Sequence, residues 1–285
     1  MLYIIILGIL EMVLRALKTH QYVEVAVRLV ELTNQNFPEH KGVEIHKAGI
    51  SYTSLMVCFR MHLIRSMIIM TKFYKLSPNY FPVTTAYLIL RTMFEININA
   101  HYISQDPERR SNEFIDYGNI IDKRKIDKYS KHKNTKKKDW AEFINAILKY
   151  DYPNKKEIVH NYENVKSKFE YTNSKGAKKL FSNWANKSLY KMACEVDHEI
   201  EYDFFYSRYS NFVHGNIKLA DRFLKIKGDK MWWSGETFEP EVAFAFRDAS
   251  AVFGCFLSLL GKQWNKVIDE EIKNCWNFDN FKTIV

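Results

Sequence analysis

The sequence predicts a mainly α-helical protein, a helical bundle with an inserted Lys-rich helical region and a small β-hairpin. Apolar residues recur at three- and four-residue spacing in almost every long segment, which is typical of helices. Gly and Pro number only 10 and 6 in 285 residues, far too few for a turn-rich all-β chain. The hydrophobic share of 47% is large enough to build a substantial core.

Four helices are expected in the first 130 residues. They cover about residues 2–34, 50–74, 83–104 and 107–129. Asp106 is expected to be the N-cap of the fourth helix, with Pro107 as its first helical residue. The second and third helices carry apolar stripes. These are Leu55, Phe59, Leu63, Met67 and Met70 in the second, and Tyr87, Leu90, Phe94, Ile98 and Tyr102 in the third.

The composition changes at Lys123–Lys138, which holds nine Lys/Arg and one Asp, and therefore +8 of the formal net charge of +9. We expect 130–138 to be a solvated loop that opens a weaker helical region over about 139–182, interrupted at 151–154 and 172–176. The chain is then one elaborated helical domain. Its core is at about 1–122 and 183–272, its insertion at about 123–182 and its hairpin at about 222–234.

Helices are expected to resume after the insertion. They are predicted at about residues 183–194, 197–213 and 240–272. Residues 223–227 and 230–233, on either side of Gly228-Asp229, match the hairpin. The apolar seam of the last helix is Val242, Phe246, Ala249, Phe253, Phe256 and Leu260.

Several classes of protein are disfavoured. The four Cys form no CxxC pair, which argues against a zinc finger or a disulfide framework. GxGxxG, GxxxxGK[ST], HExxH and GxSxG motifs are absent, so no cofactor and no metal are expected. The apolar run Leu2–Leu10 stops at Glu11, at about half the ~20 residues that span a bilayer. We therefore expect a cytoplasmic protein without membrane attachment.

The most polar-dense part of an otherwise apolar helix contains Arg208 and His214, with Ser210 and Asn211 between them. Arg208 is a fixed cation, and His214 titrates near neutrality. Together they are the minimum needed to hold a phosphate and to move protons around it, and no metal is required.

This R-x5-H spacing resembles the R-x4-6-H motif of the HEPN superfamily, whose members are often metal-independent ribonucleases in toxin–antitoxin or phage-defence systems. The residue after the Arg is often Asn, Asp or His in those nucleases, and here it is Tyr209. The resemblance implies a homodimer in which two motifs form one cleft, RNA as the substrate, and an antitoxin or inhibitor protein as a partner.

The resemblance also implies the roles of the site residues. His214 would act as general base or acid while a ribose 2′-OH attacks its own phosphate. Arg208 would stabilise the charge that develops on the phosphate oxygens. Asn211 or Ser210 would orient a phosphate or the imidazole, and Tyr206 would stack on a base.

A second pattern resembles a bacterial helical family of unknown function and covers most of residues 50–260. Its motifs are Arg91-Thr-Met-Phe-Glu95, Asp106-Pro-Glu-Arg-Arg110, and Tyr206, Ser210, His214 and Gly215. A non-catalytic helical module, binding nucleic acid or protein, is the alternative to the nuclease. In that case Arg208 pairs with Glu95, Glu201 or Asp203, and His214 caps its helix.

Arg91 and Glu95 lie one helical turn apart on an apolar helix. They form either a structural ion pair, closed by Arg208 or Arg110, or a site in which Glu95 orients His214.

The Lys-rich segment is either a solvated loop or an arm that attracts nucleic-acid phosphates, with Tyr129 and Trp140 available for stacking. The candidate contacts on this arm are Lys131, Lys133, Lys136, Lys137 and Lys138.

Overall fold

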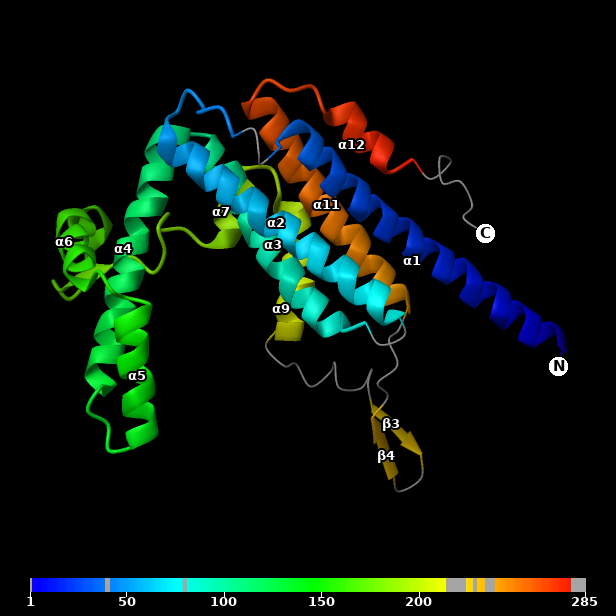
Figure 1. Cartoon of the computed structure of the whole chain (residues 1–285), viewed down its shortest axis with the longest axis horizontal. Helices are drawn as coiled ribbons and strands as arrows, with labels where there is room; N and C mark the ends of the chain where they lie inside the picture. Colours follow the sequence, from blue (N-terminus) through cyan, green and yellow to red (C-terminus); the bar gives the residue numbers. More distant parts are fainter. Residues whose placement is uncertain are drawn as a thin grey trace. The chain divides into compact units, whose positions relative to one another are not determined.

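The protein is mainly α-helical, as predicted (Figure 1). The computed structural model describes residues 2–38, 42–78, 81–213, 224–227, 230–233 and 239–277. Of these, residues 2–18, 211–213, 224–227, 230–233 and 239–240 are described by their backbone only. The chain divides into two compact units: Met1–Gln105 with Leu189–Val285 form the first, and Asp106–Ser188 form the second. The second unit thus begins before the expected insertion at 123.

The first unit is built on long helices that pack side by side, with α11 in contact with α1, α2 and α3 (Figure 1). Its helices are α1 (Leu2–Asn36), α2 (Ile50–Leu76), α3 (Val83–Ser104), α7 (Leu189–Glu195), α8 (Glu199–Glu201), a π-helix (Tyr202–Tyr206), α9 (Ser207–Val213), α11 (Glu239–Gln263) and α12 (Asp269–Cys275). Strands β3 (Leu224–Lys227) and β4 (Lys230–Trp233) form the predicted antiparallel hairpin.

The predicted apolar stripes form the core of this unit. Every residue of the α3 stripe and of the α11 seam is buried. In α2, four of the five predicted residues are buried, but Leu55 is only half-buried and its neighbour Met56 takes the core position. Three- and four-residue spacing located the buried faces of α2 and α3 because each of these helices buries mainly one side. Helix α11 is buried on most sides, and its predicted seam is part of that larger buried surface.

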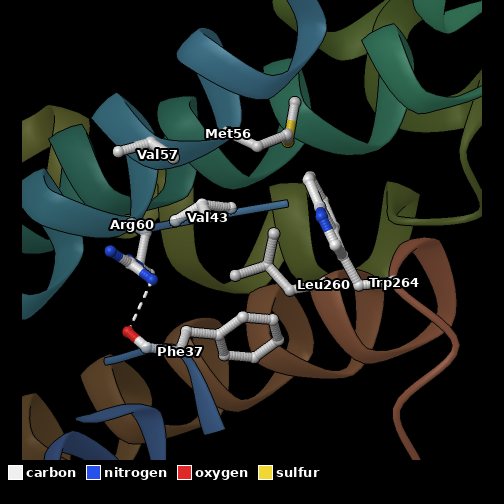
Figure 2. A pocket seen from close by; sticks show the side chains of 7 residues that line it. All are labelled: Phe37, Val43, Met56, Val57, Arg60, Leu260 and Trp264. Carbon is white, nitrogen blue, oxygen red and sulfur yellow. Dashed lines mark hydrogen bonds between the residues drawn. The ribbon is translucent and has the colours of Figure 1, made fainter. Parts of the chain in front are cut away.

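Arg60 of α2 joins α1 to this core (Figure 2). Its side chain is 3% exposed, and Nη1 donates a hydrogen bond to the carbonyl oxygen of Phe37 at 2.8 Å. The cavity beside them, lined also by Val43 and Trp264, is about 10 Å³, the size of one water. This place is a structural joint at the end of α1 and has no room for a ligand.

Two of the helices predicted after residue 182 have other bounds in the structure. The helix expected over 183–194 begins only at Leu189, since the Asn183 side chain binds the backbone N–H and C=O of Lys187 and replaces the helical pattern. The expected helix 240–272 is broken after Gln263. There Asn265 adopts a left-handed φ of 53°, and the N–H of Lys266 binds the carbonyl of Gly261 at 2.8 Å, which together terminate α11.

The helix expected over 197–213 is present without a break, but it is not α-helical throughout. It begins at Glu199 and contains the π-helix Tyr202–Tyr206 ahead of α9. Single π-turns inside helices often mark functional sites because they re-aim the residues that follow. Here the following residues include Arg208.

By length and composition, α2 and the segment Glu241–Gln263 of α11 are apolar enough to cross a membrane. Within those two helices, 44% and 72% of the respective windows are buried inside the protein. A buried core helix can be equally long and equally apolar, so it passes the same test of length and composition.

The second unit packs α4 (Pro107–His132) against α5 (Lys138–Tyr150) and α6 (Lys155–Val165). A 3₁₀ turn (Lys166–Phe169) leads into strands β1 (Glu170–Thr172) and β2 (Lys178–Leu180), which pair antiparallel with Glu170 opposite Leu180. This hairpin was not predicted, although its turn lies where the helical pattern was expected to stop. The expected loop 130–138 is shorter, because α4 continues to His132 and α5 begins at Lys138.

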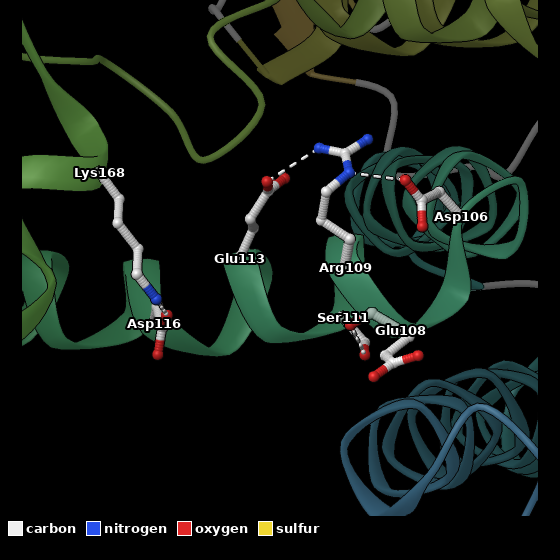
Figure 3. A network of polar contacts seen from close by, with 7 residues as sticks. All are labelled: Asp106, Glu108, Arg109, Ser111, Glu113, Asp116 and Lys168. Atoms are coloured by element: carbon white, nitrogen blue, oxygen red, sulfur yellow. Dashed lines mark hydrogen bonds and ion pairs between the residues drawn. The ribbon is translucent and has the colours of Figure 1, made fainter.

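The start of α4 is held by a polar network on the surface (Figure 3). Asp106 is the N-cap residue and Pro107 follows it, as predicted. The carboxylate of Asp106 makes no capping hydrogen bond and instead binds Nε of Arg109 at 2.6 Å, while Arg109 Nη1 binds Glu113 at 2.8 Å. Arg109 is 56% exposed, so this network contributes modestly to stability.

Two histidine rings meet in the first unit and make its stability depend on pH. The rings of His101 and His198 lie 4.6 Å apart, edge to face. Burial lowers the pKa of His101 to about 4, helped by the charges of His198 and Lys262 and opposed by Glu201. A histidine with a lowered folded pKa stabilises the fold above pH ~6.5, and this contribution is lost as the pH falls towards the folded pKa.

We therefore expect acid to remove about 2 to 3 kcal/mol of stability through His101 alone between pH 7 and about pH 4.5. Urea denaturation of wild type and His101→Gln at both pH values measures this, with the exposed His20→Gln as control. The His101→Gln variant should lose less stability on acidification than wild type and the control. Equal losses in all three proteins would contradict this assignment.

Candidate functional site

Helix α9 is fixed in place by Tyr209. This side chain is fully buried, and its ring stacks on Tyr87 of α3 with 4.9 Å between ring centroids. Its hydroxyl donates a hydrogen bond to Oδ2 of Asp248 on α11. The residue that departs from the HEPN pattern is thus the anchor that joins α9 to α3 and α11.

Asp248 is a buried carboxylate, 1% exposed, with two partners. Arg247 binds its Oδ1 through Nε at 2.7 Å and through Nη2 at 2.6 Å. Burial, together with the negative charge of Asp248, raises the pKa of Tyr209 above its ordinary range, so the phenol stays protonated and donates. The carboxylate is therefore compensated on both oxygens, as a buried charge requires.

Arg208 lies next to this anchor and is half-buried. Its guanidinium carbon lies 5.5 Å from the centre of the Phe244 ring, and that of Arg247 lies 4.9 Å from the same ring. Two guanidinium groups therefore share one aromatic ring, and Asp248 neutralises only one positive charge. Such a place attracts an anion, and the planar donors of Arg suit phosphate oxygens.

Two of the three alternative partners of Arg208 lie beside other basic groups. Glu95 forms an ion pair with Arg91, and Glu201 lies 3.5 Å from Nδ1 of His198. Among the described residues no ion pair joins Arg208 to Glu95, Glu201 or Asp203.

Arg91 and Glu95 form the predicted ion pair, at 3.1 Å between Nε and Oε1. Their third partner is Tyr206, neither Arg208 nor Arg110. Nη2 of Arg91 donates to the Tyr206 hydroxyl at 3.0 Å, and the guanidinium lies 5.1 Å from the Tyr206 ring centre. The pair is 23% and 39% exposed, so it forms a half-open network at the π-helix.

Tyr206 belongs to an aromatic row. It stacks on Tyr202 at 4.9 Å and contacts Phe94 at 6.2 Å. Burial, followed by the charge of Glu95, raises its pKa. Because Arg91, Tyr202 and Phe94 all contact Tyr206, its side chain helps to position α9 and is not free to turn towards an RNA base.

The remaining predicted site residues are placed only in part. Ser210 is half-buried on α9, and Asn211 is described by its backbone. His214 follows the last residue of α9 in the sequence and lies outside the described residues. The expected common cleft of Arg208 and His214 therefore falls outside the described residues as well.

Phe244, Arg247 and Asp248 were not among the site residues predicted from the sequence. Their signal was present, because Arg247-Asp248 is a charged pair within the apolar run Val242–Phe256. A buried charge on the core face of a helix needs a hydrogen-bond partner. For Asp248, one such partner is the hydroxyl of Tyr209.

The predicted basic contacts lie in the second unit. Lys131, Lys133, Lys136, Lys137 and Lys138 are all exposed. They surround the end of α4 and the start of α5.

The described residues contain no group of three or more His, Cys, Asp or Glu that would hold a metal ion. Cys58, Cys194, Cys255 and Cys275 are free thiols.

Comparison with known proteins gives one match. A model of a family of unknown function, DUF5677, matches residues 57–231, which include Arg91, Glu95 and Arg208. No curated protein and no solved structure matches the chain. Since the family model covers more than half of the sequence, the chain belongs to DUF5677.

Proposed function

We propose that the protein is a HEPN-like, metal-independent endoribonuclease of a toxin–antitoxin or phage-defence system, with Arg208 and His214 as its catalytic residues. The observation that carries this proposal is the position of Arg208. The buried side chain of Tyr209 anchors the helix that carries Arg208. The Arg208 guanidinium lies beside the Phe244 ring, as does that of Arg247. A pre-positioned cation of this kind stabilises charge that develops on a phosphate.

The proposed reaction is a transesterification within the RNA chain. The ribose 2′-OH gives up its proton, its oxygen attacks the adjacent phosphorus, and the bond from phosphorus to the 5′-oxygen breaks. The leaving oxygen takes up a proton, so the products are a 2′,3′-cyclic phosphate and a 5′-hydroxyl. His214 transfers the protons, and Arg208 binds the phosphate oxygens.

A homodimer completes the proposal, since two copies would supply two His214 side chains, one as base and one as acid. An antitoxin or inhibitor protein would restrain such an activity in the cytoplasm.

The second candidate is a non-catalytic helical interaction module. It is favoured by the closed pairing of the polar groups, Arg91 with Glu95 and Tyr206, and Asp248 with Tyr209 and Arg247. This candidate predicts a protein that binds RNA or a protein partner and leaves RNA intact.

A cleavage assay in EDTA tests the proposal. Wild type should cut labelled single-stranded RNA, and His214→Ala should reduce the rate by at least about 100-fold. His20→Ala, an exposed histidine of α1, is the matched control and should cut like wild type. Loss of activity in EDTA would exclude the metal-free mechanism, and full activity of His214→Ala would exclude this site.

A further inference from the structure

The second unit contains an open groove of about 390 Å³ between the end of α4 and the start of α5. Three aromatic side chains line it: Tyr129, Trp140 and Phe143. Lys128, His132 and Lys137 line it as well, so aromatic rings and basic groups border the same hollow. Neither proposed catalytic residue belongs to this unit.

The packing of α5 does not account for these rings. Ile144 and Leu148 are the buried residues of α5 and join Ile126 and Tyr152 in the core cluster of this unit. Trp140 and Phe143 remain 57% and 56% exposed, with their rings edge to face at 6.0 Å. Large aromatic side chains kept in water side by side are typical of a binding surface.

The charges around the groove are uncompensated. Lys166, Lys168 and Lys178, elsewhere in this unit, are each paired with a carboxylate. By contrast, none of the basic side chains from Lys128 to Lys138 forms an ion pair with a described residue. Asp139 and Glu142 belong to α5 but do not line the groove. The hollow therefore offers a positive rim around an apolar floor.

We propose that this groove binds single-stranded nucleic acid, with bases stacked on Trp140 and Phe143 and phosphates held by Lys128 and Lys137. Stacking on aromatic faces needs bases that are free of a complementary strand, and the flexible lysines bind the backbone without reading sequence. The binding is therefore indifferent to sequence and sensitive to salt. It stands apart from the proposed cleavage, because it requires neither Arg208 nor His214.

An anionic membrane is the competing occupant. A helix that lies on a membrane presents a continuous apolar face to the lipid. In α5, Ile144 and Leu148 are used for the core, which leaves the rings of Trp140, Phe143 and Tyr150 exposed. Of these three rings, Trp140 and Phe143 line the groove, which a flat lipid surface would leave unfilled. The structure therefore favours a strand of nucleic acid.

The test measures binding to the full-length chain by fluorescence anisotropy, in the His214→Ala background so that RNA stays intact. The probes are labelled oligo-U RNA, oligo-dT DNA and a DNA duplex, and vesicles of phosphatidylcholine with phosphatidylserine are tested by flotation. The His214→Ala protein with an unchanged groove should bind both single strands more tightly than the duplex. Trp140→Ala with Phe143→Ala should weaken single-strand binding at least about 10-fold.

Tyr150→Ala is the matched control for the rings, since Tyr150 is 69% exposed on the same helix and does not line the groove. It should bind like the parent protein. Circular dichroism checks that the double alanine variant is folded. If that variant does not fold, Trp140→Leu with Phe143→Leu takes its place, because it keeps the apolar volume and removes both stacking faces. Unchanged affinity of a folded ring variant, or flotation with vesicles without single-strand binding, would overturn the proposal.

The lysines give a second readout. Lys128→Gln with Lys137→Gln should reduce the slope of log affinity against log salt by about 1.4, or about 0.7 for each lost phosphate contact. Lys166→Gln with Lys168→Gln, whose lysines are paired with Glu163 and Asp116, should leave the slope unchanged. An unchanged slope in the first pair would refute the phosphate contacts.

Discussion

Replacing Arg208 with alanine is expected to lower the rate of RNA cleavage by about 100- to 1000-fold, the effect of removing one charge-stabilising donor from a transition state. Arg208→Lys should retain part of the rate, because it keeps the charge and loses the planar fork. Initial rates on labelled RNA in EDTA measure both. Arg65→Ala, an exposed arginine on α2, should cleave like wild type.

The loss must come from chemistry and not from unfolding. Arg208 packs on the exposed face of Phe244, whereas Tyr209 supplies the buried anchor, so removing the guanidinium leaves the helix attached. We expect the thermal unfolding of Arg208→Ala to stay close to that of wild type. A folded Arg208→Ala with the wild-type rate would remove Arg208 from the site.

Asp248→Ala is expected to destabilise the protein by about 3 to 5 kcal/mol, as when one member of a buried pair is removed. The change leaves the Tyr209 hydroxyl buried without its acceptor and Arg247 without its carboxylate. The anchor between α9 and α11 would be lost with it. Tyr209→Phe should cost less, about 1 to 2 kcal/mol, because Arg247 still compensates the carboxylate.

Urea denaturation of the two single variants and the double variant measures the coupling between Asp248 and Tyr209. Glu24→Ala is the control, since Glu24 pairs with Arg28 at 3.4 Å on a partly exposed helix face and should contribute about 0.5 kcal/mol at most. An Asp248→Ala variant as stable as Glu24→Ala would show that the buried network does not hold α9.

Much of the fold was predictable because the apolar residues of its core helices recur at helical spacing. The α3 stripe and the α11 seam repeat every three or four residues, and the structure buries every residue of both. The break after α11 was not predictable from that pattern, since apolar residues continue across it. It depends on the left-handed backbone of Asn265 and on the hydrogen bond from Lys266 to Gly261. The β1–β2 hairpin was missed because strands of three residues are too short to show alternation.

The candidate site was predictable only where its partners are close in the sequence. Arg91 and Glu95 are one turn apart, and their ion pair was expected. The contact of Arg91 with Tyr206 spans 115 residues, and that of Tyr209 with Asp248 spans 39. Contacts of this kind arise when helices pack, and helical spacing alone does not specify which buried polar groups will meet.

The ends of the RNA products test the central proposal most directly. Wild-type protein incubated with a defined RNA in EDTA should yield 2′,3′-cyclic phosphate and 5′-hydroxyl ends, identified by mass spectrometry. Arg208→Ala and His214→Ala should yield at least about 100-fold fewer of these ends in the same time. Fragments with 3′-hydroxyl and 5′-phosphate ends, or cyclic-phosphate ends produced equally by both variants, would contradict cleavage by Arg208 and His214.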